Sequence, residues 1–250
     1  MNDEFDESEV LDLVAKALSE KGDKAFKSKS KLPLAMGDSN LLEKLSEILP
    51  IYLNQGDVQM VVYELRNELH KDLSVDETLE QLHMITRNCK KCPEVLQGSQ
   101  IPHWNVADPD VVFVADSPSL DGTSMEMFTK TASGAGFTST RLCMTFVNRC
   151  KKASRAKHTI EEINTCTPYL LSEIQILKPK LIIPLGLIAT NAILGANLHL
   201  NEERGKIIWL GPWAILPTFS PSYVLRGGGN LNNLFIQDME KAFNFVYGEK

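Results

Sequence analysis

The sequence predicts an α/β fold in which helices cover both faces of a parallel sheet, with a helical extension before it. Short runs in the C-terminal two-thirds of the chain have the length of strands and are apolar throughout. Segments with helical spacing separate these runs. Apolar strands that alternate with helices are typical of a parallel sheet buried on both sides. The 250 residues, 43% of them hydrophobic, suffice for one large domain or a medium domain with an extension.

Four apolar runs are the expected strands, and the residues that follow them form the candidate site. In such sheets, ligands bind beyond the carboxyl ends of the strands. The loops to consider are therefore 116–122, 148–157 and 219–229. The expected strands are residues 110–115, 144–147, 181–185 and 214–217, and the expected helices are residues 125–134, 160–177 and 187–194.

The N-terminal part of the chain has a different pattern, which indicates helices joined by a linker. A lysine- and serine-rich stretch over 21–31 has the composition of a solvated tether. We expect a helical extension at 1–80, which binds a replication or repair protein, and a separate domain at 81–250. The helices expected in the extension are residues 8–20, 39–49, 57–69 and from 75 to the first cysteine.

The charge distribution argues against a wholly basic nucleic-acid coat, because the net charge is −6. Basic residues nevertheless gather in the loop 148–157, whereas the first twenty residues are acidic. This acidic start lacks the apolar core of a secretory signal. The most apolar stretch, 181–198, is interrupted by proline and glycine, so no membrane span is expected. We therefore expect a reducing, cytoplasmic location.

Five cysteines divide into two pairs and one isolated residue. Cys89 and Cys92 have the Cys-x2-Cys spacing that lets both sulfurs reach one metal centre, and Cys150 and Cys166 bracket a basic loop and the start of an expected helix. The expected occupant is an iron–sulfur cluster or a structural zinc ion. The alternatives are buried thiols that pack as small hydrophobic groups, or disulfides. Cys143 lies in an apolar run and is expected in the core.

Several short motifs follow one another from the first cysteine pair to the C-terminus. They are CKKCP at 89–93, ADSPS at 115–119, CTPYLL at 166–171, KPKLIIPLG at 178–186, RGK at 204–206 and PTFSPSYVLR at 217–226. Their order, over about two-thirds of the chain and with all four paired cysteines in register, resembles the uracil-DNA glycosylase superfamily. The specific resemblance is to its iron–sulfur branch, family four, with divergent active-site motifs.

The resemblance implies a three-layer α/β/α sandwich with a central four-stranded parallel sheet. It also implies a 4Fe–4S cluster on the four paired cysteines, with zinc as the lesser possibility. The implied activity is monofunctional hydrolysis of the N-glycosidic bond of uracil or another altered pyrimidine in DNA. Asp116 lies where this branch commonly has Glu and would position water or stabilise the cationic sugar. Its simpler interpretation is an aspartate that forms a turn.

Three departures from the family's pattern concern the chemistry. Ser220 stands where the family usually has a histidine that donates to the base, and it is the expected base contact. The segment 118–136 is shorter than usual and lacks an aromatic that stacks on the base, and Phe128 is expected in the core instead. Asn148 lies near, but not in register with, an asparagine that reads the base edge. The alternative function is therefore a catalytically weak or silent module that acts as a DNA-binding or replication-accessory protein.

The basic loop after the second expected strand is a candidate for phosphate contacts, which give salt-sensitive affinity that does not depend on base sequence. A solvated loop is the simpler alternative. His158 in this loop is expected to be an ordinary surface residue. The expected base and DNA contacts are Ala115, Ser117, Pro118, Ser119, Asn148, Arg149, Lys151, Lys152, Arg155, Lys157, Ser222, Tyr223 and Arg226.

Overall fold

The structure is a computed structural model that describes residues 75–87, 89–92, 108–118, 122–138, 142–151, 157–195 and 198–248. The chain divides into two compact units, residues 1–73 and 74–250, and every described residue belongs to the second. The linker and the helices expected before residue 74 therefore lie outside the described residues. No described helix is long and apolar enough to cross a membrane.

A five-stranded sheet forms the centre of the second unit. Its strands are β1 (Val111–Ala115), β2 (Leu142–Phe146), β3 (Leu181–Pro184), β4 (Ile208–Leu210) and β5 (Trp213–Ile215), in the order β2-β1-β3-β5-β4. The four strands predicted from the sequence are all present and parallel. The fifth, β4, is joined to β5 by a tight turn at 211–212 and pairs antiparallel with it. It was not predicted: its residues are apolar, but the strand is only three residues long, shorter than the runs from which strands were predicted.

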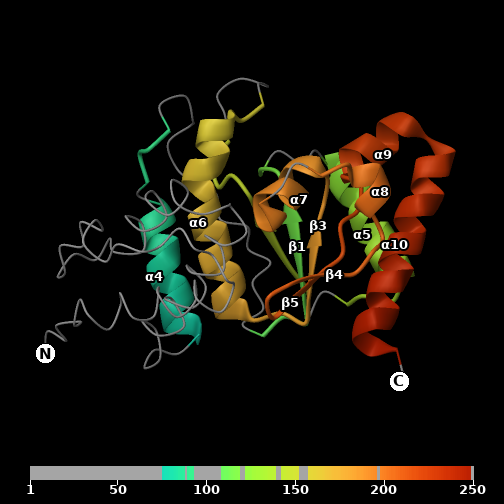
Figure 1. Ribbon diagram of the computed structural model, residues 1–250, viewed down its shortest axis with the longest axis horizontal. Helices are drawn as coiled ribbons and strands as arrows, with labels where there is room; N and C mark the ends of the chain where they lie inside the picture. The colour runs from blue at the N-terminus through green and yellow to red at the C-terminus, as the bar shows by residue number, and fades with distance from the viewer. Residues whose placement is uncertain are drawn as a thin grey trace, which may run out of the picture. The chain divides into compact units, whose positions relative to one another are not determined.

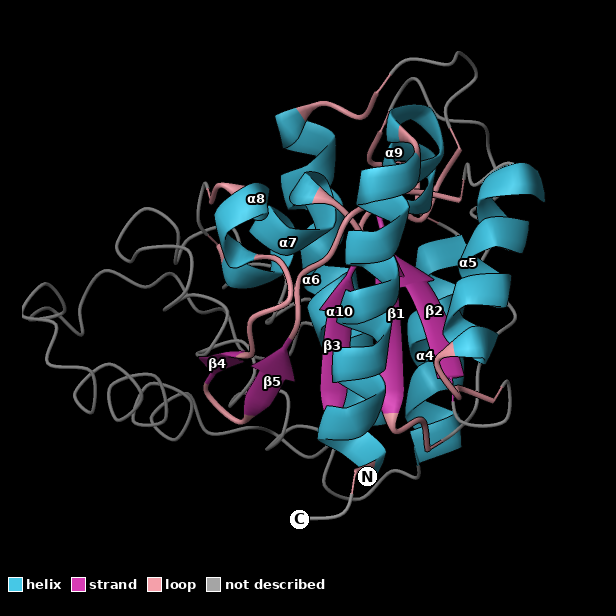
Figure 2. Cartoon of the chain, turned by 90° about the vertical axis from the view of Figure 1, so that its right-hand side faces the viewer, coloured by secondary structure: helices cyan, strands magenta, loops and turns pink. Residues whose placement is uncertain are grey.

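Helices cover both faces of the sheet, which confirms the three-layer α/β/α sandwich (Figure 1). They are α4 (Val75–Arg87), α5 (Gly122–Gly134), α6 (Ile160–Leu177), α7 (Leu187–Leu194), α8 (Leu200–Glu203), α9 (Pro221–Gly227) and α10 (Gly229–Tyr247). α6 and α7 lie on one face, and α5 and α10 on the other, with α10 in front of β1 and β3 in Figure 2. α4 packs against the outer side of α6 and runs through the expected boundary at residue 80.

The residues 221–227 form helix α9, although a loop was expected at 219–229. Pro221 occupies the first helical turn, where its fixed φ angle suits a helix and its missing N–H costs nothing. Gly228, with φ 74°, separates α9 from α10. Sequence reasoning missed this helix because its seven residues are too few for a periodic pattern.

The core between the sheet and α5 and α10 is rich in phenylalanine. Phe113 of β1 contacts Phe128 and Phe137 edge-on, with ring centroids 4.9 and 5.8 Å apart. Phe128 is fully buried, as expected. Val112 and Val114, the neighbours of Phe113 along β1, are also fully buried. Because successive strand residues face opposite sides, both faces of the sheet are covered.

Candidate functional site

The four paired cysteines line one pocket bounded by α4, β2 and α6. The first pair follows α4, the third cysteine follows β2, and the fourth lies in α6. The pocket contains about 340 Å³ of empty space, part of it open to solvent. Its lining residues are Thr86, Cys89, Cys92, Arg149, Cys150, Thr165, Cys166 and Tyr169. The fold therefore brings together two cysteine pairs that are distant in the sequence.

None of the cysteines that line this pocket forms a disulfide, so the disulfide alternative does not describe the structure. Burial and the neighbouring thiols raise the pKa of Cys150 to about 11, and burial raises the pKa of Cys166. Thiolates are the form that binds a metal, so a metal-containing group bound here would displace these protons. Cys143 lies apart, fully buried in β2, which confirms its expected place in the core.

The start of α6 orients Cys166 towards the pocket. Thr159 and Glu162 form a reciprocal capping box, in which each side chain accepts a hydrogen bond from the other residue's backbone N–H. His158 Nδ1 lies 3.3 Å from the Glu162 carboxylate, and its side chain is only 9% exposed. His158 is therefore not the surface residue that was expected. The cap defines where α6 begins, and the backbone N–H of Arg149 donates to Cys166 Sγ over 3.4 Å.

Beneath the pocket, Arg149 and Glu173 form a fully buried ion pair. Arg149 Nη2 donates to Glu173 Oε2 over 2.5 Å, and both side chains are 1% exposed. Thr145 also donates to Glu173, and His83 Nε2 lies 3.6 Å from its other oxygen. Burial alone would raise the pKa of Glu173, but the Arg149 charge and these hydrogen bonds outweigh it and lower the pKa to about 2. The carboxylate is therefore charged at neutral pH.

Asp116 directly follows β1, and its carboxylate is largely buried. The backbone N–H of Ala189, in the first turn of α7, donates a hydrogen bond to it. Asp116 Oδ1 is buried and has no hydrogen-bond partner among the described residues. Burial raises the pKa of Asp116 to about 6, against the opposing effects of the Ala189 N–H and the Lys157 charge. A carboxylate that changes charge near neutral pH, at the carboxyl end of a parallel strand, is a candidate for catalysis.

Ser220 lies on the other side of the turn that leads into α7. Gly186, between β3 and α7, packs so closely that a Cβ atom there would lie 3.1 Å from the Ser220 Cβ. Ser220 occupies the N-cap position of α9, yet its side chain makes no capping hydrogen bond. Its Oγ lies 3.5 Å from Ser222 Oγ. The Ser220 hydroxyl is therefore not needed by the helix and can donate to a ligand.

A second buried network supports the segment that carries Ser220. Thr218 Oγ1 donates to Asp238 Oδ2 over 2.6 Å, and Arg204 Nε donates to the same oxygen over 2.9 Å. The Arg204 guanidinium also lies over the Phe219 ring, 5.5 Å from its centroid. Burial raises the pKa of Asp238, although Thr218 and Arg204 oppose the shift. Arg204, from one of the sequence motifs, thus links the residues before Ser220 to α10.

Two of the expected DNA contacts are buried and engaged elsewhere. Asn148 is 3% exposed, and its Nδ2 donates to the Glu162 backbone carbonyl in α6 over 3.1 Å. Arg149 is held by Glu173, as described above. Arg149 had been expected to contact phosphates as part of a basic loop, and Asn148 to lie near the position of an asparagine that reads the base edge, but the tertiary structure directs both into the protein. We therefore remove Arg149 and Asn148 from the candidate contacts.

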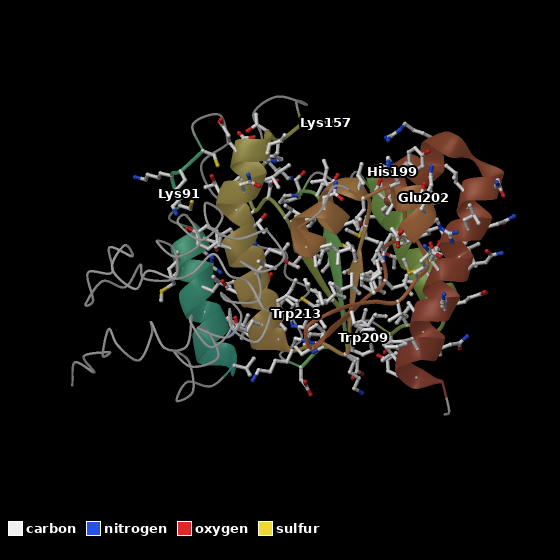
Figure 3. All side chains as sticks on the ribbon, viewed as in Figure 1. Lys91, Lys157, His199, Glu202, Trp209 and Trp213 are labelled. Carbon is white, nitrogen blue, oxygen red and sulfur yellow. The ribbon has the colours of Figure 1, made fainter. Side chains whose placement is uncertain are left out.

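The remaining expected contacts differ in exposure. Lys151, Lys157, Tyr223 and Arg226 are exposed, and Lys157 lies at the end of the molecule to which the strands point (Figure 3). Half-buried positions are Ser117, Pro118 and Ser222, whereas Ala115 is buried in β1. Ser119, Lys152 and Arg155 lie outside the described residues. The exposed members are those that a phosphate backbone can reach.

Comparison with known proteins identifies the family. The sequence model of the family described as "Uracil DNA glycosylase superfamily" matches residues 102–244, more than half of the chain. The chain belongs to the uracil DNA glycosylase superfamily. Two relatives are named "Type-4 uracil-DNA glycosylase". The protein from Thermotoga maritima is 28% identical over 188 residues, covering 70% of this chain and 97% of its own. The protein from Pyrobaculum aerophilum is 29% identical over 139 residues, covering 52% and 71%.

Sequence reasoning about this superfamily member missed the residues that surround the expected ones. Glu173 stands in an apolar part of α6, seven residues after Cys166 and thus on the same helical face. The spacing from Cys166 could therefore have indicated Glu173 from the sequence. Ala189 and Gly186 gave no comparable signal, because Ala189 acts through its backbone and Gly186 through having no side chain.

Proposed function

We propose that the protein is a monofunctional DNA glycosylase that hydrolyses the N-glycosidic bond of uracil or another altered pyrimidine. The observation that carries the proposal is the pair formed by Asp116 and Ser220, which flank one turn at the carboxyl ends of the parallel strands. The names of the relatives from Thermotoga maritima and Pyrobaculum aerophilum support the same activity.

Asp116 is the proposed catalytic carboxylate. A glycosylase removes its target base from the stack and breaks the bond to a sugar that develops positive charge. An ionised Asp116 stabilises that charge and orients the attacking water through Oδ1, the oxygen without a partner among the described residues. The Ala189 N–H holds the carboxylate in place.

Ser220 is the proposed contact to the departing base. The base leaves with negative charge, which a hydroxyl donor stabilises. A serine hydroxyl is shorter than an imidazole and is a weaker partner for this charge. We therefore expect slower base release than in a glycosylase that has histidine at this position, by about two orders of magnitude.

The cysteine pocket is the proposed site of a 4Fe–4S cluster. Cys89, Cys92, Cys150 and Cys166 would hold it, and the group would supply structural cross-linking of α4, β2 and α6. Four thiolates around one zinc ion would lie only about 3.8 Å from each other. The four cysteines line a pocket that is partly open to solvent, and no three acidic, histidine or cysteine side chains among the described residues are placed to hold one ion. This arrangement favours the cluster over zinc.

The exposed basic residues are the proposed phosphate contacts. Lys151 and Lys157 flank the basic loop, and Arg226 ends α9. We also propose that the protein works in a reducing compartment, where the thiolates stay available to the metal. A replication or repair protein remains the proposed partner of the extension at 1–80.

Base release from defined oligonucleotides tests the proposed activity. Anaerobically purified protein is incubated with single- and double-stranded DNA that contains uracil or other altered pyrimidines, and abasic sites are revealed by alkaline cleavage. We expect release from at least one substrate, and a loss of about 100-fold in Asp116→Asn. Asp108→Asn, the same change at an exposed position before β1, is the matched control and should retain full activity.

The accessory-module alternative predicts a different outcome. Tight DNA binding without base release from any substrate would overturn the enzymatic proposal and select the silent module. The glycosylase names of the two relatives do not favour that alternative. Undiminished release by Asp116→Asn would instead remove Asp116 from the mechanism while leaving the activity in place.

A further inference from the structure

Arg149 is the largest fully buried side chain of the described residues, and it lines the cysteine pocket. A guanidinium carries its charge at all ordinary pH values and has five N–H donors, so each buried one needs an acceptor. Its sequence neighbour Lys151 is exposed. The fold has therefore placed one positive charge of the basic loop inside the protein, beside four sulfur ligands.

Only one nitrogen of this guanidinium has a partner in the described part of the chain. Nη2 donates to Glu173 Oε2 over 2.5 Å and to the Tyr169 carbonyl over 3.4 Å. Nε and Nη1 are buried, and neither has a hydrogen-bond partner. Glu173 is in turn held by Thr145 and lies beside His83, so the guanidinium is anchored on one side and unsatisfied on the other.

The pocket offers the acceptors that these donors lack. Half of the residues that line the pocket are cysteines, so sulfur atoms are its main potential acceptors. The Arg149 backbone already donates to Cys166 Sγ over 3.4 Å. Thiolate-bound clusters are anionic, and hydrogen bonds to their sulfurs stabilise the more negative, reduced form.

We propose that Arg149 is a positioning residue that donates hydrogen bonds from Nε and Nη1 to the sulfur atoms of the group bound in the cysteine pocket, with Glu173 as its anchor. This inference rests on the proposed cluster. Arg149 thereby retains the cluster and raises its reduction potential. The basic residue next to Cys150 thus serves the cofactor and not DNA.

The test compares Arg149→Met with Lys151→Met in anaerobically purified full-length protein. Both variants lose one positive charge at a residue adjacent to Cys150, but only Arg149 is buried. The measurements are iron per chain, the midpoint potential from a redox titration followed by electron paramagnetic resonance, and the rate at which a chelator bleaches the visible absorption. For Arg149→Met we expect a more negative midpoint potential and iron loss roughly 10-fold faster. Lys151→Met should match the wild type, because water screens its charge.

Two further variants keep the inference testable if Arg149→Met fails to fold. Arg149→Met/Glu173→Gln avoids an unpaired buried carboxylate while still lacking the donors, and it should show a smaller shift in the same negative direction. Arg149→Lys keeps the charge and should recover part of the potential.

The outcomes separate this inference from the proposed cofactor. A wild-type potential and bleaching rate in the double variant, at full iron content, would overturn the role of Arg149 and leave the cluster standing. Wild-type protein that contains no iron would overturn the cluster proposal, and the role of Arg149 with it.

Discussion

Asp116 shows how burial can prepare a single residue for chemistry at some cost in stability. Its pKa is raised to about 6 mainly by desolvation, and one backbone N–H and the Lys157 charge oppose the shift. The unfolded chain, in contrast, holds this carboxyl at an ordinary pKa near 3.8. The folded protein therefore binds a proton more tightly than the unfolded chain between these two pH values.

The sign of this linkage gives a prediction for stability. Because the folded-state pKa is the higher one, the stabilising contribution of Asp116 is complete below about pH 4 and is lost as the pH rises through about 6. The difference in unfolding free energy between Asp116→Asn and wild type should therefore shift in favour of the variant by about 1–3 kcal/mol from pH 4 to pH 8. Urea denaturation at the two pH values measures this difference. An equal effect of the substitution at both pH values would contradict the raised pKa.

The same titration predicts the acid limb of the pH–rate profile. The proposed role requires the ionised carboxylate, so single-turnover base release should rise with pH and level off above about pH 6. The residual rate of Asp116→Asn should lack this limb. If Asp116→Asn keeps an acid limb with the same midpoint, that limb belongs to the titration of another group.

At the scale of elements, the turn between β3 and α7 holds the two proposed catalytic residues together. Gly186 has φ 101° and ψ 172°, a conformation that essentially only glycine adopts. Its backbone N–H donates to the Thr218 carbonyl over 2.8 Å, which joins the turn to the segment before Ser220. Ala189, three residues later, contacts Asp116. The turn therefore sets the position of both side chains.

Gly186→Ala should disturb this arrangement. The new methyl group would meet the Ser220 Cβ and force an unfavourable φ, so we expect a loss of roughly 1–3 kcal/mol in unfolding free energy. Base release should fall about 10-fold or more, because Ser220 moves away from the base. Gly134→Ala is the matched control, since Gly134 has no neighbour within 4 Å of an added Cβ. Equal stability and activity of the two variants would contradict the proposed role of the turn.

At the scale of the whole molecule, the four paired cysteines connect the end of α4, the end of β2 and α6. Iron removal or Cys166→Ala should therefore lower the melting temperature of the described unit by several degrees, because binding to the folded state alone stabilises it. Cys143→Ala is the control, since this buried thiol lies outside the pocket and the variant should keep its iron and visible absorption. Iron analysis and thermal unfolding followed by circular dichroism measure both effects.

The exposed lysines near the strand ends predict how DNA affinity depends on salt. Lys151→Ala and Lys157→Ala should each reduce the slope of log K against log salt by about 1, because each removes one phosphate contact. Lys130→Ala, an exposed lysine on α5, should leave the slope unchanged. DNA affinity is measured by fluorescence anisotropy at salt concentrations from about 50 to 200 mM, a range over which such slopes are resolved. Identical slopes in all three variants would exclude these lysines from the interface.

The sequence alone determined the alternation of strands and helices, because local periodicity and apolar runs report burial directly. α6 and α7 begin and end where the pattern predicted, and the four cysteines and the ordered motifs indicated the family. Only the tertiary structure decided that Arg149 is buried and Lys151 exposed, and that Asn148 bonds to α6. It also placed Asp116 against α7, where burial changes its pKa. The physical reason is that the state of a polar side chain depends on partners far away in the sequence, which no local pattern specifies.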